Sequence, residues 1–228
     1  MKIAILSDIC ANIEALEAVL QACAAEAVAE YLVLGSVVGE GPNPTECLNR
    51  LSEVAVRAQV MGCFDMHVAD PTDNWSIGWS RLEGKRIIEW TRSELSEDHL
   101  ELLRALPMTG IVDQFTITNA SIIKPEYFIP IETQSEASDS FAVLTSQVLL
   151  YGRSYRPLCW KEHLTSKPQS IPGDKVTLGE NRYLMSFGNV GLPKEPSLVA
   201  HLEKLHNKFR AFCTSTGEWA LAFMEILP

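Results

Sequence analysis

The stretch MKIAILSDICAN, residues 1–12, decides the fold class of this chain. Its apolar first half predicts a buried β-strand, and Asn12 is a good N-cap for the helix that the spacing of apolar residues predicts next. Asp8 and Cys10 lie between these two elements. A carboxylate delivered at the end of a buried strand, two residues before a thiol, is a place where chemistry can occur. The sequence therefore indicates a strand–loop–helix unit with a candidate site in its loop.

The same pattern recurs twice downstream. YLVLGSVVGEGPNP at residues 31–44 and VAVRAQVMGCFD at residues 54–65 each predict a strand that ends in a loop. Strands that alternate with helices form largely parallel sheets through right-handed crossovers, and ligands bind at the carboxyl ends of such strands. We therefore expect Asp8, Ser36 and residues 63–65 to gather at one edge of a sheet.

The remainder of the chain follows other patterns. Residues 74–107 are predicted to be helical, and Pro107 closes that segment. Short apolar runs bounded by turn residues then predict mainly β structure, arranged as a second sheet packed on the first. The polar residues 132–140 show little periodicity and are predicted to form a loop. Residues 209–227 predict a terminal β-hairpin.

Composition limits the classes of function. The chain has 228 residues, of which 46% are hydrophobic and 21% charged, and this suits a single domain spanning residues 1–228. A formal net charge of −10 repels polyanions and argues against nonspecific nucleic-acid binding. No signal region and no apolar run near the roughly 20 residues of a membrane span are present, so we expect a cytoplasmic protein without a membrane partner. The six dispersed cysteines form no C-x-x-C pair and are expected to be reduced thiols.

Six motifs, in a fixed order, carry a resemblance to a known family. They are SDICAN from residue 7, LGSVVGEGPNP from residue 34, GCFD from residue 62, TNAS from residue 118, GRSYRP from residue 152 and FGNVGLPK from residue 187. Their order and approximate spacing resemble the calcineurin-like metallophosphoesterases, in particular the small bacterial and archaeal phosphodiesterases, over nearly the whole chain. The resemblance implies an α/β (α+β) fold, a four-layer αββα sandwich of two mixed β-sheets flanked by helices.

The residues that hold two metal ions in that family are mostly replaced. The corresponding positions are Asp8, Cys10, Ser36, Cys63, Asn119, Arg153 and Tyr155. Of these, only Asp8 keeps the residue type of the family. The position of the family's protonating histidine is Phe64, which is followed by Asp65. A two-metal site needs a bridging carboxylate, and Ser36 cannot bridge; an Arg side chain repels a cation. These residues therefore line a remnant pocket to which no catalytic role, metal or cofactor is assigned.

Two hypotheses of function follow. The first is a pseudoenzyme, a catalytically inactive metallophosphoesterase-fold protein with a binding or regulatory role, whose partner is another protein or a small anionic ligand. The alternative is a divergent metal-dependent phosphodiesterase or phosphatase that uses Asp8 with a reduced or Cys-containing centre. Zinc accepts both thiolate and carboxylate ligands, so Cys10 and Cys63 are the candidate ligands in that case. A purely structural subunit and a homo-oligomer stay open.

Basic residues of the later motifs suggest two roles. Arg153, Arg156 and Lys194 are candidates for binding an anion, since an arginine can hold a phosphate or carboxylate through two hydrogen bonds. Arg153 can instead neutralise Asp8, because an ionised carboxylate buried without a counter-charge is costly. We hypothesise that the Arg153 guanidinium takes the space of a metal ion and pairs with Asp8, with Tyr155 as a second donor.

Overall fold

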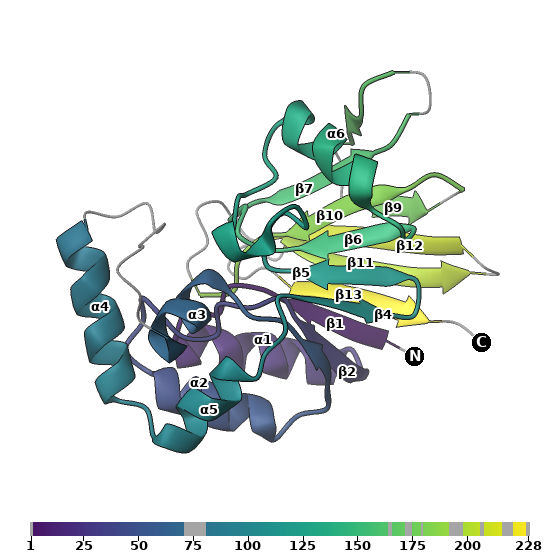
Figure 1. The fold of residues 1–228 in the computed structure, drawn as a ribbon. Coiled ribbons are helices and arrows are strands. Elements are labelled where there is room, and N and C mark those ends of the chain that lie inside the picture. The colour runs from purple at the N-terminus through teal and green to yellow at the C-terminus, as the bar shows by residue number, and fades with distance from the viewer. Residues whose placement is uncertain are drawn as a thin grey trace.

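The computed structural model describes residues 2–70, 81–163, 166–171, 175–178, 180–191, 198–205, 208–215 and 221–226. Two β-sheets lie between helices, with α6 at the top of the view in Figure 1 and α1 to α5 at the bottom. The first sheet has the strand order β3-β2-β1-β13-β11-β12-β9, and the second has the order β4-β5-β6-β10-β7-β8. The architecture is the mixed sandwich that the resemblance implied.

The N-terminal segment forms one side of the first sheet. Its elements alternate as predicted: β1 (Lys2–Leu6), α1 (Ile13–Ala25), β2 (Val28–Val33), α2 (Pro44–Ser52) and β3 (Val56–Gln59). β1 pairs in parallel with β2, and β2 with β3. The Asn12 side chain accepts a hydrogen bond from the Ala15 N–H at 2.9 Å and so caps α1, as its position predicted. Local sequence signals therefore account for this part of the fold.

The other side of the first sheet is built from late strands. They are β9 (Lys175–Leu178), β11 (Leu198–Leu205), β12 (Lys208–Ser215) and β13 (Leu221–Ile226). The predicted hairpin over residues 209–227 is wrong, because β13 lies between β1 and β11 while β12 pairs with β11 and β9. The cause is β1, a strand buried on both faces that needs a hydrogen-bonded neighbour on each edge. These strands therefore join the first sheet, not the predicted second one.

The second sheet carries one covering helix. Its strands are β4 (Thr109–Val112), β5 (Phe115–Thr118), β6 (Val148–Tyr151), β7 (Pro157–Lys161), β8 (Gln169–Ser170) and β10 (Tyr183–Phe187). The 3-10 helix η1 (Pro125–Tyr127) and the helix α6 (Gln134–Val143) connect β5 to β6. The loop predicted for residues 132–140 is wrong, since α6 begins there. Thr133 and Glu136 form a capping box, and Ala137 and Phe141 pack onto the sheet.

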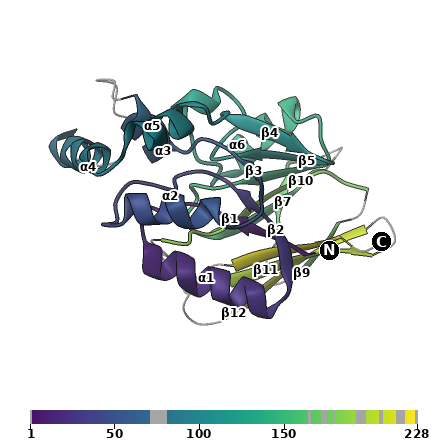
Figure 2. The same cartoon turned by 90° about the horizontal axis from the view of Figure 1, so that it is seen from below.

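Three further helices stand beside α1 and α2. They are α3 (Cys63–Ala69), α4 (Arg81–Ser93) and α5 (Glu97–Arg104). The predicted helical segment 74–107 is thus divided, with Ser96 as the N-cap of α5, and residues 71–80 lie outside the described part. Figure 2 shows α4 at the periphery of the molecule. Across the described residues, each helix is too short or too polar to traverse a bilayer.

Three apolar clusters hold the layers together. One lies between the two sheets and contains Ile5 and Leu34 from the first sheet side and Phe115 and Leu150 from the second. A second lies between α1 to α5 and the outer face of the first sheet, and a third lies under α6. Burial of apolar area is the dominant favourable term in folding. These clusters fix the strands whose ends carry the motif loops.

Candidate functional site

The loop after β1 is held between its neighbours by main-chain hydrogen bonds. The Asp8 N–H donates to the Gly35 carbonyl at 3.0 Å, and the Cys10 N–H donates to the Ser36 carbonyl at 2.8 Å. On the other side, the Gly191 N–H donates to the Asp8 carbonyl at 2.9 Å. The first, second and last motifs therefore meet at the strand ends, as the alternation of strands and helices predicted.

Asp65, at the start of α3, fastens the loop of the second motif. Its carboxylate accepts the main-chain N–H groups of Ser36 (2.8 Å), Val37 (2.9 Å), Val38 (3.1 Å) and Gly62 (2.9 Å). Burial raises the pKa of Asp65 to about 6, and the four donors oppose that rise. The sequence places Asp65 in the remnant pocket. The structure gives it the position of a buried anchor whose partners are main-chain groups.

Asn119, at the end of β5, connects the two sheets. Its side-chain amide donates to the Leu34 carbonyl at 2.6 Å and to the Asp8 carboxylate at 3.3 Å. Its side-chain oxygen accepts the Cys63 N–H at 3.3 Å. Both the nitrogen and the oxygen of the Asn119 side-chain amide are thus hydrogen-bonded to the protein. These bonds join the fourth motif to the first three.

Asp8 lies at the centre of these loops and is buried. Its carboxylate accepts the Ser7 hydroxyl at 2.7 Å, the Arg153 main-chain N–H at 2.8 Å and the Asn119 amide at 3.3 Å. Burial raises the pKa of Asp8, whereas these three donors and the positive charge of Arg153 lower it. Both carboxylate oxygens are therefore hydrogen-bonded to the protein itself.

Arg153 supplies the positive charge of the site and is half-buried. Burial raises the pKa of the Cys63 thiol, and both the charge of Arg153 and a hydrogen bond from its side chain oppose that rise. The same charge lowers the pKa of Cys10 and Tyr155, which burial raises. The hydrogen bond to Asp8 that we assigned to the guanidinium comes from the Arg153 main chain, while the guanidinium acts on Asp8 through its charge.

Left-handed backbone conformations concentrate in these loops. Positive φ angles occur at Asp8 (51°), Cys10 (53°), Ala11 (57°), Ser36 (54°), Arg153 (60°) and Tyr155 (55°). Residues other than glycine rarely adopt this region and keep it where the surrounding structure imposes it. The loop hydrogen bonds above supply that constraint. The backbone therefore fixes the geometry of the site both at Asp8 and at four of the replaced positions, Cys10, Ser36, Arg153 and Tyr155.

The remaining predicted residues, and His67 of α3, have different surroundings. Phe64 is buried in the apolar cluster under the helices, where its ring leaves no room for a Cβ at Gly39 (2.6 Å). Arg156 is exposed, and Lys194 lies outside the described residues, so the predicted anion-binding group of Arg153, Arg156 and Lys194 stays a prediction. His67, one turn along α3, is buried, and the charge of Arg153 lowers its pKa together with burial, the larger cause.

Sequence reasoning missed several residues that support the site. Ser7 donates to Asp8, and Gly152 packs so close that an added Cβ would lie 2.0 Å from the Ser7 hydroxyl oxygen. Ser154 and Ser186 join their hydroxyl groups at 2.5 Å beneath the Arg153 loop. Ser7, Gly152 and Ser154 all stand within the quoted motifs, which was the available signal.

The side chains present do not fit a two-metal centre. Ser36 stands where a bridging carboxylate is needed, and the oxygens of Asp8 already accept three hydrogen bonds. In the part of the chain that the structure describes, no three His, Cys, Asp or Glu side chains gather as a group that could hold a metal ion. Asp8, Cys10 and Cys63 therefore do not form such a group, and we derive no reaction step through a metal.

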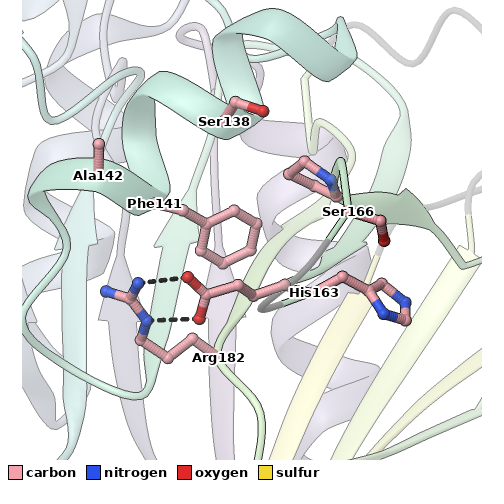
Figure 3. Close-up of a pocket in the computed structure, with 8 residues that line it drawn as sticks. Ser138, Phe141, Ala142, His163, Ser166 and Arg182 are labelled. Atoms are coloured by element: carbon pink, nitrogen blue, oxygen red, sulfur yellow. Dashed lines mark hydrogen bonds and ion pairs between the residues drawn. The ribbon is translucent and has the colours of Figure 1, made fainter.

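A separate pocket of about 250 Å³ opens beside α6 (Figure 3). Its lining residues are Ser138, Phe141, Ala142, Glu162, His163, Ser166, Pro168 and Arg182. The Arg182 guanidinium forms an ion pair with Glu162 through two nitrogens, and its carbon lies 5.8 Å from the centre of the Phe141 ring. Because Glu162 neutralises Arg182, this pocket has no excess charge with which to attract an anion. It contains no residue of the quoted motifs.

Known proteins with the same architecture were found by structure comparison. A metallophosphoesterase from Sphaerobacter thermophilus matches with a TM-score of 0.75 and 26% identity, over 94% of this chain and 88% of that one. A hypothetical protein from Pyrococcus horikoshii matches with a TM-score of 0.64 and 18% identity, over 99% of this chain and 87% of that one.

Sequence comparison finds a relative at a similar level of identity. An uncharacterised protein of Methanocaldococcus jannaschii is 27% identical over 203 residues, which is 85% of this chain and 77% of that protein. No family model matches the sequence. The sandwich, the order of its motif loops and the structural neighbours together show that this chain has the calcineurin-like metallophosphoesterase fold.

Proposed function

We propose that this chain is a catalytically inactive metallophosphoesterase-fold protein that acts by binding a partner protein or a small anionic ligand. The observation that carries this proposal is the environment of Asp8. This carboxylate accepts hydrogen bonds from Ser7, Asn119 and Arg153 at 2.7, 3.3 and 2.8 Å, and the charge of Arg153 acts on it. A metal ion bound to Asp8 would have to compete with these donors for the carboxylate oxygens and bear the repulsion of a guanidinium.

The position of the general acid supports the same proposal. Phe64 can neither give nor take a proton, and it is packed in the apolar cluster under the helices. A positioned general acid contributes roughly 10²- to 10⁴-fold to a rate, and the loss of a two-metal centre costs more. Both replacements support the proposal, because hydrolysis by the route of the fold family would have to proceed without this general acid and without most of the family's metal ligands.

Metal content and phosphodiesterase activity test the proposal. We expect the purified protein to carry much less than one iron, manganese or zinc ion per chain, as measured by inductively coupled plasma mass spectrometry. We also expect no turnover of bis(p-nitrophenyl) phosphate above background with added Mn²⁺. The Asp8→Ala variant is the matched control. Mn²⁺-dependent turnover that disappears in Asp8→Ala would overturn the proposal and favour a divergent hydrolase built on Asp8, Cys10 and Cys63.

A further inference from the structure

We propose that Arg153 is a built-in cation that replaces a metal ion in this site and allows the loops around Asp8 to stay together without one. The inference rests on the proposed function, because it concerns the same site and assumes that a metal is not resident there. It assigns to Arg153 a positioning role through its charge, distinct from the hydrogen bond that its main chain donates.

The approach of the Arg153 loop to Asp8 is closer than a side chain would permit. A Cβ added at Gly152 would lie 2.0 Å from the Ser7 hydroxyl oxygen, 3.1 Å from an oxygen of the Asp8 carboxylate and 3.2 Å from the Asn119 amide nitrogen. The next residue, Arg153, then donates its N–H to that carboxylate at 2.8 Å. Glycine at 152 therefore allows the loop to close directly over the buried acid.

The backbone of this loop holds Arg153 in a defined orientation. Arg153 and Tyr155 have φ angles of 60° and 55°, and the Ser154 hydroxyl between them is joined to Ser186 at 2.5 Å and to the Arg156 carbonyl at 2.8 Å. A left-handed residue between such fixed points has few alternatives. The side chain of Arg153 is directed to the start of α3, where it hydrogen-bonds the Cys63 sulfur.

Among the groups whose charges act on Cys10, acidic ones predominate. The carboxylates of Asp8, Glu40 and Asp65 all act on the thiol of Cys10, and the charge of Arg153 opposes them. An ionised carboxylate that is buried without a counter-charge costs several kcal/mol. A guanidinium stays protonated at every physiological pH and cannot be removed by a chelator. It supplies the positive charge permanently, where a metal ion would supply it reversibly.

Melting temperatures of charge variants test the inference. Arg153→Met removes the cation but keeps a long side chain, and we expect it to lower the Tm by about 6 to 15 °C. Arg153→Lys keeps a positive charge and should lose less than half as much. Arg156→Met, an exposed arginine of the same loop, is the matched control and should shift the Tm by less than about 2 °C. Asp8→Asn removes a hydrogen-bond acceptor as well as the carboxylate charge. We therefore expect it to lower the Tm less when it is added to Arg153→Met than when it is made in the unmodified protein, because only in the variant does it also remove an uncompensated charge.

The outcomes separate this inference from the proposed function. Equal losses in Arg153→Met and Arg153→Lys would show that the residue acts through packing or its hydrogen bond to Cys63, and would overturn the inference alone. An Asp8→Asn substitution that lowers the Tm equally in Arg153→Met and in the unmodified protein would do the same. A Tm of the unmodified protein that falls on treatment with EDTA would also overturn it. Mn²⁺-dependent hydrolysis would overturn the proposed function whatever the melting temperatures. If Arg153→Met does not fold, Arg153→Lys still decides, since a charge role requires the variant that keeps the charge to fold.

Discussion

Ser36 donates its main-chain N–H to the carboxylate of Asp65 through a buried hydrogen bond of 2.8 Å. Ser36 stands where the family resemblance implies a metal-bridging carboxylate, while Asp65 belongs to the third motif. The Asp65 carboxylate also accepts the N–H groups of Val37 and Val38. The loop of the second motif therefore keeps its shape through an acid on α3, whatever side chain stands at position 36.

Asp65 predicts a specific dependence of stability on pH. Its pKa is about 6 in the folded protein and near 3.8 in the unfolded chain, so the folded state binds more protons between these pH values. The free energy of unfolding should therefore rise as the pH falls from about 6.5 to 4, by up to about 3 kcal/mol from this group. Urea denaturation of the unmodified protein and of Asp65→Asn at several pH values isolates the effect. The free energy of unfolding of the unmodified protein minus that of Asp65→Asn should increase as the pH falls. A decrease would contradict the prediction, because it would mean that folding lowers the pKa of Asp65.

Gly62 should tolerate no side chain. A Cβ at this position would lie 1.8 Å from the Ser36 main-chain nitrogen, and a main-chain atom cannot move aside cheaply. We expect Gly62→Ala to destabilise the protein by more than about 4 kcal/mol or to abolish folding. Gly110→Ala is the control. Its added Cβ would lie 3.1 and 3.3 Å from two side-chain atoms of Ile117, which can shift, and its other neighbour, a side-chain atom of Val60, lies at 3.7 Å. Denaturation midpoints that are equal for the two variants would refute this account.

Arg92 should stabilise the end of α3 that lies away from the site. Its guanidinium donates to the carbonyl oxygens of Val68 at 2.6 Å and Ala69 at 2.8 Å, which the helix leaves without internal partners. We expect Arg92→Met to cost about 1.5 to 3 kcal/mol in denaturant melts. Arg86 lies at an exposed position of α4, the helix that also carries Arg92. Arg86→Met should change the free energy of unfolding by less than about 0.5 kcal/mol. Equal effects of the two substitutions would show that the capping contact contributes nothing.

Cys10 should behave as a core residue. The sequence places it in a remnant pocket, but the residue is 1% exposed, and a Cβ added at Gly191 would lie 3.2 Å from the Cβ of Cys10. Cys10→Ser places a hydroxyl in that space and should cost about 1 to 3 kcal/mol. Leu34→Ala, which opens a cavity between the sheets, should cost about 2 to 5 kcal/mol. A Cys10→Ser variant as stable as the unmodified protein would mean that water reaches this position.

The predictable part of the fold is the part with local signals. The first strand, the Asn12 cap and the first loop follow from neighbouring residues, and the motifs imply the sandwich. The helix at 134–143 was missed because its surface is polar, although Thr133 and Glu136 form a capping box and Phe141 is buried. The signal was present in the sequence, and the polar composition outweighed it.

The pairing of segments far apart in the sequence was harder to predict than the local elements. No local feature of residues 221–226 predicts that β13 will lie beside β1. The requirement for a hydrogen-bonded neighbour comes from β1, a buried strand far away in the sequence. In the site, the positions of Asp8, Ser36 and Asn119 were predictable as neighbours. The partners of Asp65 were not, since all four are main-chain N–H groups, which every residue except proline possesses.

The place of β13 determines when the first sheet can form. Ile5 of β1 lies opposite Ala222 of β13, so this pairing closes nearly the whole described chain into one loop. Contacts between such distant segments slow folding, because the entropy of closing the loop is lost before the contacts form. Until β13 arrives, β1 presents an apolar strand with an open edge, which is a template for pairing with another molecule. The interval before β13 docks is therefore when β1 is most exposed to pairing between molecules, the first step of aggregation.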